Sequence, residues 1–246
     1  MPASLMTIGE GVLVVFQAAA RGAPGVVEDD QRIRVRPVRG IAERGVFGIP
    51  GDHRLEYCEV LECATLPSSL RAIGEYSFSG CSKLGRVTFA TPSGLAVNDA
   101  DTFSRCAALS TVAIPSMVKA IHTHAFAMCT RLVSVYMATD GALAWIGIRA
   151  FSECAALRTV AFPPSLASIG PRAFYACRRL CDVTFAEPSS LAAISEYAFE
   201  ECDALEAVTL PASHRSYATN AFGPRVAVSG LSSSFRVDFP NAIILE

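Results

Sequence analysis

Residues Leu143–Pro163 read LAWIGIRAFSECAALRTVAFP, and they define a unit that the chain repeats along most of its 246 residues. The unit has the frame Leu-x-x-Ile followed by Ala-Phe-x-x-Cys-x-x-Leu-x-x-Val-x-(Phe/Ile)-Pro. The Phe of this unit recurs at the same position in each repeat, and Leu55 occupies that position in the first repeat. The recurring residues are Phe78, Phe103, Phe126, Phe151, Phe174, Phe199 and Phe222. The steps alternate strictly between 23 and 25 residues. A period of this length is typical of a solenoid, in which each repeat forms one coil and stacks on the next.

Each repeat carries the signals of one strand and one tight turn. In Val160-x-Phe162 and its counterparts, two apolar residues are predicted to point inward from a short strand that pairs in parallel with its neighbours. Phe151 and Cys154 are three residues apart, so one face of a helical turn would bury both. We therefore predict an α/β solenoid of the leucine-rich-repeat type with about seven coils. A parallel β-sheet should form its concave face, with short helical or 3-10 segments opposite.

The frame does not cover the two ends of the chain. Gly11–Phe16 is rich in β-forming residues, and Arg32–Arg36 alternates charged and apolar residues as a half-buried strand does. After Phe222 the frame fails because Arg225 replaces Cys, and Phe235–Pro240 alternates again like a closing strand. The predicted division is a non-repeat β-rich N-terminal cap at 1–54, the solenoid at 55–222 and a C-terminal cap at 223–246.

The full frame, Leu-x-x-Ile-x-x-x-Ala-Phe-x-x-Cys-x-x-Leu-x-x-Val-x-Ile-Pro-x-Ser, resembles the BspA-like leucine-rich repeat family of bacterial surface proteins. The resemblance covers roughly two-thirds of the chain and is specific, because several motif positions recur together at fixed spacing. It implies a non-enzymatic protein that is exported and binds host matrix proteins or other cells. It assigns no binding residue, because the motif positions of the family are structural.

Composition limits the classes of partner and the cellular compartments that we expect for this protein. The net charge is −2 and the pI about 6.1, so nucleic acid is not an expected partner. No apolar run is long enough for a transmembrane segment. Gly11–Phe16 followed by Gln17–Ala20 resembles a short signal-peptide core, yet no Lys or Arg precedes Arg21, so we expect no cleaved signal there. The resemblance implies a secreted, cell-surface or periplasmic protein, and a cytoplasmic location stays open.

Seven of the nine cysteines share the column three residues after the Phe column: Cys58, Cys81, Cys106, Cys129, Cys154, Cys177 and Cys202. Because this column points inward, we expect buried, reduced and inert thiols rather than disulfides. Cys63 and Cys181 lie outside it and form no Cys-x-x-Cys pattern, so metal binding through sulfur is not expected. No cofactor is predicted.

One group of polar residues is not required by the repeat. His122 and His124 occupy the same two columns as Asp99 and Asp101 of the preceding coil, so stacking would bring each imidazole beside a carboxylate. Two imidazoles and two carboxylates could hold a metal ion. Surface His–Asp contacts are the simpler interpretation.

The outward strand positions form the first candidate binding surface. They carry small, weakly polar residues with one aromatic, Tyr136, in the middle. Sheet-forming preference alone would explain the threonines, whereas a protein partner could use the flat face with Tyr136 as its anchor. The candidate partner-binding residues are Arg86, Thr88, Thr111, Ser134, Tyr136, Thr159, Asp182 and Thr184.

The second candidate surface lies on one flank. Trp145, the only Trp, stands six residues before Phe151, in a column that holds Val97 and Ala120 in the two preceding coils. A bulky ring beside small residues suggests an apolar hollow for a small hydrophobic ligand, although Trp145 could simply cover a turn.

No catalytic motif is present: the chain lacks a Gly-x-Ser-x-Gly elbow, a P-loop, a His-Glu-x-x-His and a Gly-x-Gly-x-x-Gly. The sequence therefore favours a non-enzymatic protein-interaction module, such as an adhesin or host-matrix binder that uses the concave sheet. The alternative is a small hydrophobic-ligand binder that uses the flank near Trp145.

Overall fold

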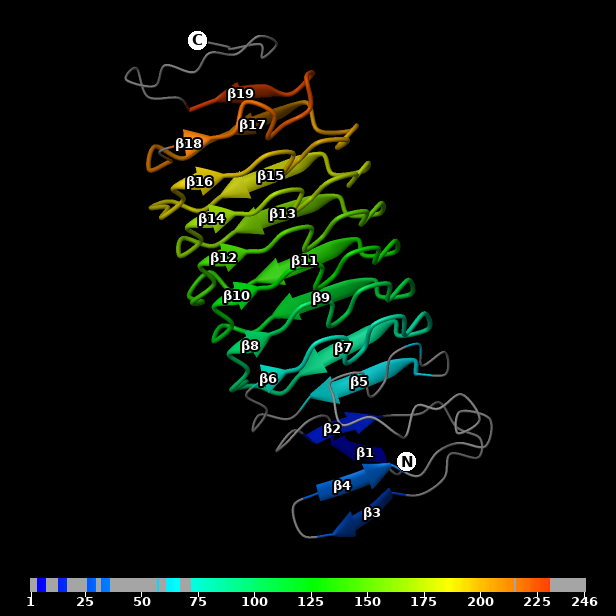
Figure 1. Cartoon of the computed structure of the whole chain (residues 1–246). Helices are drawn as coiled ribbons and strands as arrows, with labels where there is room; N and C mark the ends of the chain where they lie inside the picture. The colour runs from blue at the N-terminus through cyan, green and yellow to red at the C-terminus, as the bar shows by residue number, and fades with distance from the viewer. Residues whose placement is uncertain are drawn as a thin grey trace.

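The stacked coils form a single elongated solenoid. The computed structural model describes residues 61–66, 72–214 and 216–230, residue 57 and four short strands of the N-terminal segment. Two rows of strands run side by side along the stack, with β3 and β4 at one end and β19 at the other (Figure 1). The leucine-rich-repeat solenoid predicted from the repeat is confirmed in these residues.

The longer row of strands comes from the Val-x-(Phe/Ile) segments of the repeat. Its parallel members are β5 (Cys63–Leu66), β7 (Arg86–Phe89), β9 (Thr111–Ile114), β11 (Ser134–Met137), β13 (Thr159–Phe162) and β15 (Asp182–Phe185). Each strand pairs with the strand of the next coil, and Val135 lies opposite Val112 on one side and Val160 on the other. Exposed and buried residues alternate strictly in β9 and β13. The predicted inward direction of the Val and Phe/Ile positions is confirmed.

The second row consists of two-residue strands from the Leu-x-x-Ile part of the frame. These are β6 (Ala72–Ile73), β8 (Val97–Asn98), β10 (Ala120–Ile121), β12 (Trp145–Ile146), β14 (Ser168–Ile169), β16 (Ala193–Ile194) and β18 (Ser216–Tyr217). They form a seven-stranded parallel sheet in sequence order. Ile121, Ile146 and Ile169 are fully buried, so this sheet also lines the core.

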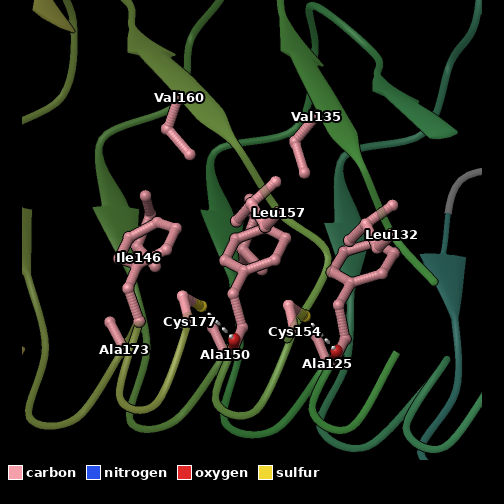
Figure 2. Packing of buried hydrophobic residues seen from close by; sticks show 14 of the residues in the cluster. Ala125, Leu132, Val135, Ile146, Ala150, Cys154, Leu157, Val160, Ala173 and Cys177 are labelled. Atoms are coloured by element: carbon pink, nitrogen blue, oxygen red, sulfur yellow. Dashed lines mark hydrogen bonds between the residues drawn. The ribbon is translucent and has the colours of Figure 1, made fainter. Parts of the chain in front are cut away.

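The Phe column forms a continuous aromatic stack through the core. From Phe78 to Phe222 the rings of successive coils lie 5.0–5.3 Å apart between centroids and within 12° of parallel. Phe126 and Phe151 have no exposed surface. Full burial of such a side chain stabilises a fold by ~1.5–3 kcal/mol, and each stacked pair adds about 0.5–1.5 kcal/mol. Figure 2 shows the repeated packing of Ala, Leu, Val and Ile positions around these rings.

The predicted short helical or 3-10 segments are not confirmed in the described residues, where the Ala-Phe-x-x-Cys segment forms successive turns. Residues two before and two after each Phe from Phe78 to Phe199 have positive φ, such as His124 at 54° and Met128 at 60°. The backbone N–H groups of His124, Phe126 and Met128 donate to carbonyls of the next coil at 2.8–2.9 Å. A helix would turn these donors back to its own carbonyls. In this stack the N–H groups donate to the next coil instead, and the two residues with positive φ on either side of the Phe make this possible.

Part of the N-terminal segment extends the long sheet. β1 (Ser4–Thr7) and β2 (Leu13–Phe16) pair antiparallel, and β2 pairs antiparallel with β5, the first of the parallel strands. β3 (Val26–Asp29) and β4 (Arg32–Val35) form a separate antiparallel pair. Strands predicted around 11–16 and 32–36 are thus confirmed. The division into two caps and a solenoid stays a prediction, and the expected closing strand at 235–240 lies outside the described residues.

The last coil is shorter than the others. β17 (Ala207–Thr209) pairs with β19 (Ala227–Ser229), and Ala207 lies opposite Ala227. Ala207 follows Phe199 by eight residues, whereas Ala227 follows Phe222 by only five. The frame therefore ends through a three-residue deletion rather than a simple exchange of Cys for Arg225.

Candidate functional site

The outward residues of β5, β7, β9, β11, β13 and β15 form one continuous surface, which we call the sheet face. Ser134 is half-buried, and the other seven candidate partner-binding residues are exposed: Arg86, Thr88, Thr111, Tyr136, Thr159, Asp182 and Thr184. Stacking of the coils brings all eight onto this face through the register of the parallel strands. Whether they bind a partner stays a prediction.

Tyr136 is the most exposed large apolar side chain on the sheet face. It lies in the middle strand, β11, and 62% of its surface is exposed. Its partner in the ladder is Ala113 of β9, and the corresponding residue of β13 is the exposed Ala161. The ring therefore projects above small neighbours and offers an aromatic surface with a polar tip, which is typical of interface anchors.

Trp145 lies next to Ala120 in the short-strand sheet, and Val97 lies one strand further on. Ala120 pairs with Val97 on one side and with Trp145 on the other. Trp145 is half-buried, and its ring packs edge-on against the ring of His122 with 5.4 Å between centroids. The indole thus covers a polar ring of the preceding coil. The apolar-ligand hypothesis for Val97, Ala120 and Trp145 stays a prediction.

Among the four candidate metal ligands, His124 and Asp101 form an ion-pair contact, and the four residues do not form a cluster. His124 Nδ1 lies 3.5 Å from Asp101 Oδ2, as the column alignment predicts. The ring of His122 packs on Trp145, and Asp99 uses its backbone carbonyl to accept a hydrogen bond from the Thr102 hydroxyl. Among the described residues, no group of three or more His, Cys, Asp or Glu is arranged to hold a metal ion.

The cysteine column has a role that its inward direction alone did not reveal. All its described members are buried free thiols, as predicted, and Cys58 lies outside the described residues. Each thiol from Cys106 to Cys202 donates to the carbonyl oxygen of the Phe in the preceding coil, and the Sγ–O distances are 3.2–3.3 Å. Dashed lines in Figure 2 mark two of these bonds, from Cys154 and Cys177. The repeated Cys is therefore a small apolar residue that also donates to a buried carbonyl between coils.

Burial favours the protonated thiols of Cys106, Cys129 and Cys154. It raises the pKa of Cys129 from the ordinary 9.0 to about 12. Burial is also the largest cause of the raised pKa of Cys106 and of Cys154, and neighbouring thiols add to both shifts. Protonated thiols are poor nucleophiles and poor metal ligands, so Cys106, Cys129 and Cys154 are poorly suited to either role.

A network of exposed charged and aromatic side chains connects the turns that contain Phe174 and Phe199. Arg178 contacts Glu201 at 2.9 Å and Asp203 at 3.7 Å, and the Tyr175 hydroxyl also donates to Glu201. The guanidinium of Arg172 lies 4.7 Å from the centroid of the Tyr197 ring. These contacts link one coil to the next across exposed positions, and such pairs contribute little each to stability. The repeat frame did not predict these contacts, because the residue types at these exposed positions differ from coil to coil.

Comparison with known families now identifies the repeat. The BspA type leucine rich repeat region matches residues 51–142 and 137–228, with 6 copies. The chain belongs to the BspA-type leucine-rich repeat family. The predicted resemblance is thereby confirmed, and this BspA-type repeat protein has a fold generally used for protein–protein interaction. No curated protein sequence matches it.

Solved structures of other bacterial repeat proteins are similar to this BspA-type repeat protein. The T. pallidum leucine rich repeat protein TpLRR is 29% identical with a TM-score of 0.54, over 62% of this chain and 68% of that chain. The pneumococcal vaccine antigen PcpA is 21% identical with a TM-score of 0.43, over 69% of this chain and 51% of that chain. A leucine rich cell surface protein from Faecalibacterium prausnitzii is 19% identical with a TM-score of 0.33, over 92% and 86%. TpLRR supports the leucine-rich-repeat fold.

The scaffold of this family is typically non-enzymatic, in line with the lack of a catalytic motif in the sequence. Within the described residues, the structure has no helix with the length and apolar character that a bilayer crossing requires.

Proposed function

We propose that this BspA-type repeat protein is a non-enzymatic interaction module that binds a protein partner across the sheet face, with Tyr136 as the central anchor. A host extracellular-matrix protein is the partner class that the family resemblance favours. In that setting the protein acts as an adhesin at the cell surface or after secretion.

The exposure of Tyr136 among small neighbours is the observation that carries this proposal. A flat surface of threonine, serine and alanine lets a partner approach closely, and a projecting aromatic ring can enter a pocket of that partner. Six parallel strands, from β5 to β15, form the sheet face. At a spacing of ~4.8 Å between strands the face is roughly 24 Å long, which is enough for a protein–protein interface of ordinary size.

Charge contributes little on the sheet face. Among the candidate residues only Arg86 and Asp182 are charged, and they have opposite signs. Electrostatic steering of a partner toward the face should be weak, so shape and the aromatic anchor must supply most of the affinity.

The test is surface plasmon resonance against a panel of purified extracellular-matrix proteins. Tyr136→Ala should weaken binding to any matrix protein that the parent binds by roughly thirtyfold, the loss typical of an aromatic anchor. Ile148→Ala removes another exposed apolar side chain, 45% exposed and outside the sheet face, and should leave the affinity unchanged. Raising the salt from 50 to 200 mM should change the affinity less than about threefold.

Equal affinity of Tyr136→Ala and the parent for such a protein would contradict the proposal, provided that their melting temperatures agree. Absence of binding to every matrix protein in the panel would overturn the assignment of the partner class.

A further inference from the structure

The two edges of the long-strand sheet differ in charge. The edge at the amino ends of the parallel strands comprises residues 80–86, 105–111, 128–134, 153–159 and 176–182, which contain seven cations and two anions. The edge at their carboxyl ends, at 90–96, 115–119, 138–144, 163–167 and 186–192, contains one cation and two anions. The whole chain has a net charge of −2, so the positive charge of the first edge is a local feature.

Six cations at the first edge form no ion pair with any other described residue. We call them the basic edge: Lys83, Arg86, Arg105, Arg131, Arg158 and Arg179. All six are exposed. The ion pairs among the described residues involve none of them, since these pairs use Arg178 and His124 instead. Their heads are thus available to an external anion.

Stacking places these residues along one edge of the sheet. They come from five successive coils, whose strands β7, β9, β11, β13 and β15 follow one another in the sheet. At ~4.8 Å between strands, the basic edge is roughly 20 Å long. In the next coil, the same positions at 201–207 contain Glu201, Asp203 and Glu206 and no cation. An anionic chain that lies along the solenoid would therefore be attracted over these five coils and repelled beyond them.

We propose that the basic edge binds sulfated polysaccharide chains. The proposal deepens the adhesion function proposed above and rests on it, because sulfated glycans are components of an extracellular matrix. Five of the six cations are arginines, whose planar guanidinium groups donate two parallel hydrogen bonds to one oxyanion. One such group in each of the five coils matches a linear polymer with an oxyanion on each unit.

The surroundings of the basic edge favour a polymer recognised by charge. In the five coils, the columns that hold these cations contain no aromatic side chain, and Met128 and Val133 are their only large apolar residues. Single-stranded nucleic acids are bound with the help of aromatic rings on which the bases stack. A protein partner would be expected to need apolar anchor pockets. A sulfated chain requires neither of these features.

Binding of size-defined heparin oligosaccharides, measured by calorimetry on the full chain, tests the proposal. The parent should bind them with an affinity that falls steeply between 50 and 200 mM salt. The double variant Arg131→Gln/Arg158→Gln should bind roughly five- to twentyfold more weakly, because each lost arginine removes a contact to a sulfate. Lys119→Gln removes one exposed cation from the opposite edge and should change the affinity less than about twofold.

Three comparisons identify the ligand chemistry and the site. Desulfated heparin should not bind, and polyphosphate and single-stranded DNA of equal length should bind at least about tenfold more weakly than heparin. Equal binding of desulfated heparin, polyphosphate or DNA would overturn the assignment to sulfated chains. Equal losses in Lys119→Gln and the double variant would overturn the site.

Tyr136→Ala separates this inference from the proposed function. It should leave heparin binding unchanged, because Tyr136 is uncharged and is not a basic-edge residue; of the sheet-face candidates only Arg86 belongs to the basic edge. Loss of matrix-protein binding in Tyr136→Ala together with no heparin binding by the parent would refute only the inference. Heparin binding by the basic edge without any Tyr136-dependent protein binding would refute only the proposed function.

Discussion

The buried columns and the sheet face of this solenoid differ in how closely one coil repeats the next. In the core, Phe78 to Phe222 form one stack, and successive thiols donate to successive Phe carbonyls. On the sheet face, the position of Tyr136 holds Thr88, Ala113, Ala161 and Thr184 in other coils. A core position must fit the same neighbours in every coil, whereas an outward position meets only solvent or a partner. The repeated columns therefore determine the fold, and positions that vary are where a binding function can reside.

The largest expected effect comes from breaking the aromatic stack. Phe151→Ala should lower the free energy of unfolding by ~3–5 kcal/mol, because it leaves a cavity between two fully buried rings. Nearest-neighbour coupling between coils should make the loss cooperative along the array. Thermal and urea unfolding measure it. Thr159→Ala on the sheet face of the same coil is the control, and its change should stay within about 0.5 kcal/mol; a parent-like melt of Phe151→Ala would contradict the proposed packing.

Alkaline pH should destabilise the protein through the same core. The folded chain keeps Cys129 protonated up to a pKa of about 12, whereas the unfolded chain loses this proton near 9.0. The stabilisation by the buried thiol is therefore complete below pH 9 and is lost as the pH rises from 9 to 12. Each such thiol should lower the free energy of unfolding by up to ~1.4 kcal/mol per pH unit in this window.

Urea unfolding at pH 8, 10 and 11 measures the alkaline effect. Cys129→Val removes this titration and should show a shallower decline than the parent. Parallel declines in the two proteins would show that the Cys129 thiol does not contribute.

Removal of one interior thiol should have an intermediate effect. Cys129→Ala deletes the donor to the Phe103 carbonyl and a buried sulfur atom, so the free energy of unfolding should fall by about 1–3 kcal/mol. Cys181→Ala removes an exposed thiol and should change it by less than about 0.5 kcal/mol. Equal urea midpoints for the two variants would show that the cysteine column is not structural.

The smallest expected effect concerns the left-handed turns. Met128 has a φ of 60°, which costs a side-chain-bearing residue ~1–2 kcal/mol, and Gly occupies the corresponding position at Gly80 with a φ of 70°. Met128→Gly should raise the free energy of unfolding by up to about 1 kcal/mol, because the relief of strain is partly offset by the greater entropy of the unfolded chain. Differential scanning calorimetry can resolve this change, and a lower melting temperature would contradict it.

The sequence predicted the features that depend on periodicity. The strands at Val160-x-Phe162 and its equivalents, the inward Phe and Cys columns and the approach of His124 to Asp101 follow from stacking identical coils. The turn conformation could not be predicted this way, because three-residue spacing of Phe and Cys suits a helical turn and a non-helical turn equally. The positive φ values occur at residues as different as His124 and Arg149, so residue type gave no signal.

The candidate site was predictable to a lesser degree. The sequence placed Tyr136 at the centre of the sheet face, and the structure shows its exposure above Ala113. The packing of His122 against Trp145 depends on side-chain directions that spacing does not reveal. The basic edge was missed because its cations occupy four different columns, and only the three-dimensional stack aligns them.

Two aromatic deletions within one coil test the central claim most directly. Phe126 belongs to the buried stack and Tyr136 to the sheet face, ten residues further along the chain. Melting temperature and matrix-protein binding should be measured for Phe126→Ala, Tyr136→Ala and the parent. The account predicts a large loss of melting temperature in Phe126→Ala, and a parent-like melt with roughly thirtyfold weaker binding in Tyr136→Ala. Equal losses of melting temperature in the two variants, or parent-like binding by a folded Tyr136→Ala, would contradict it.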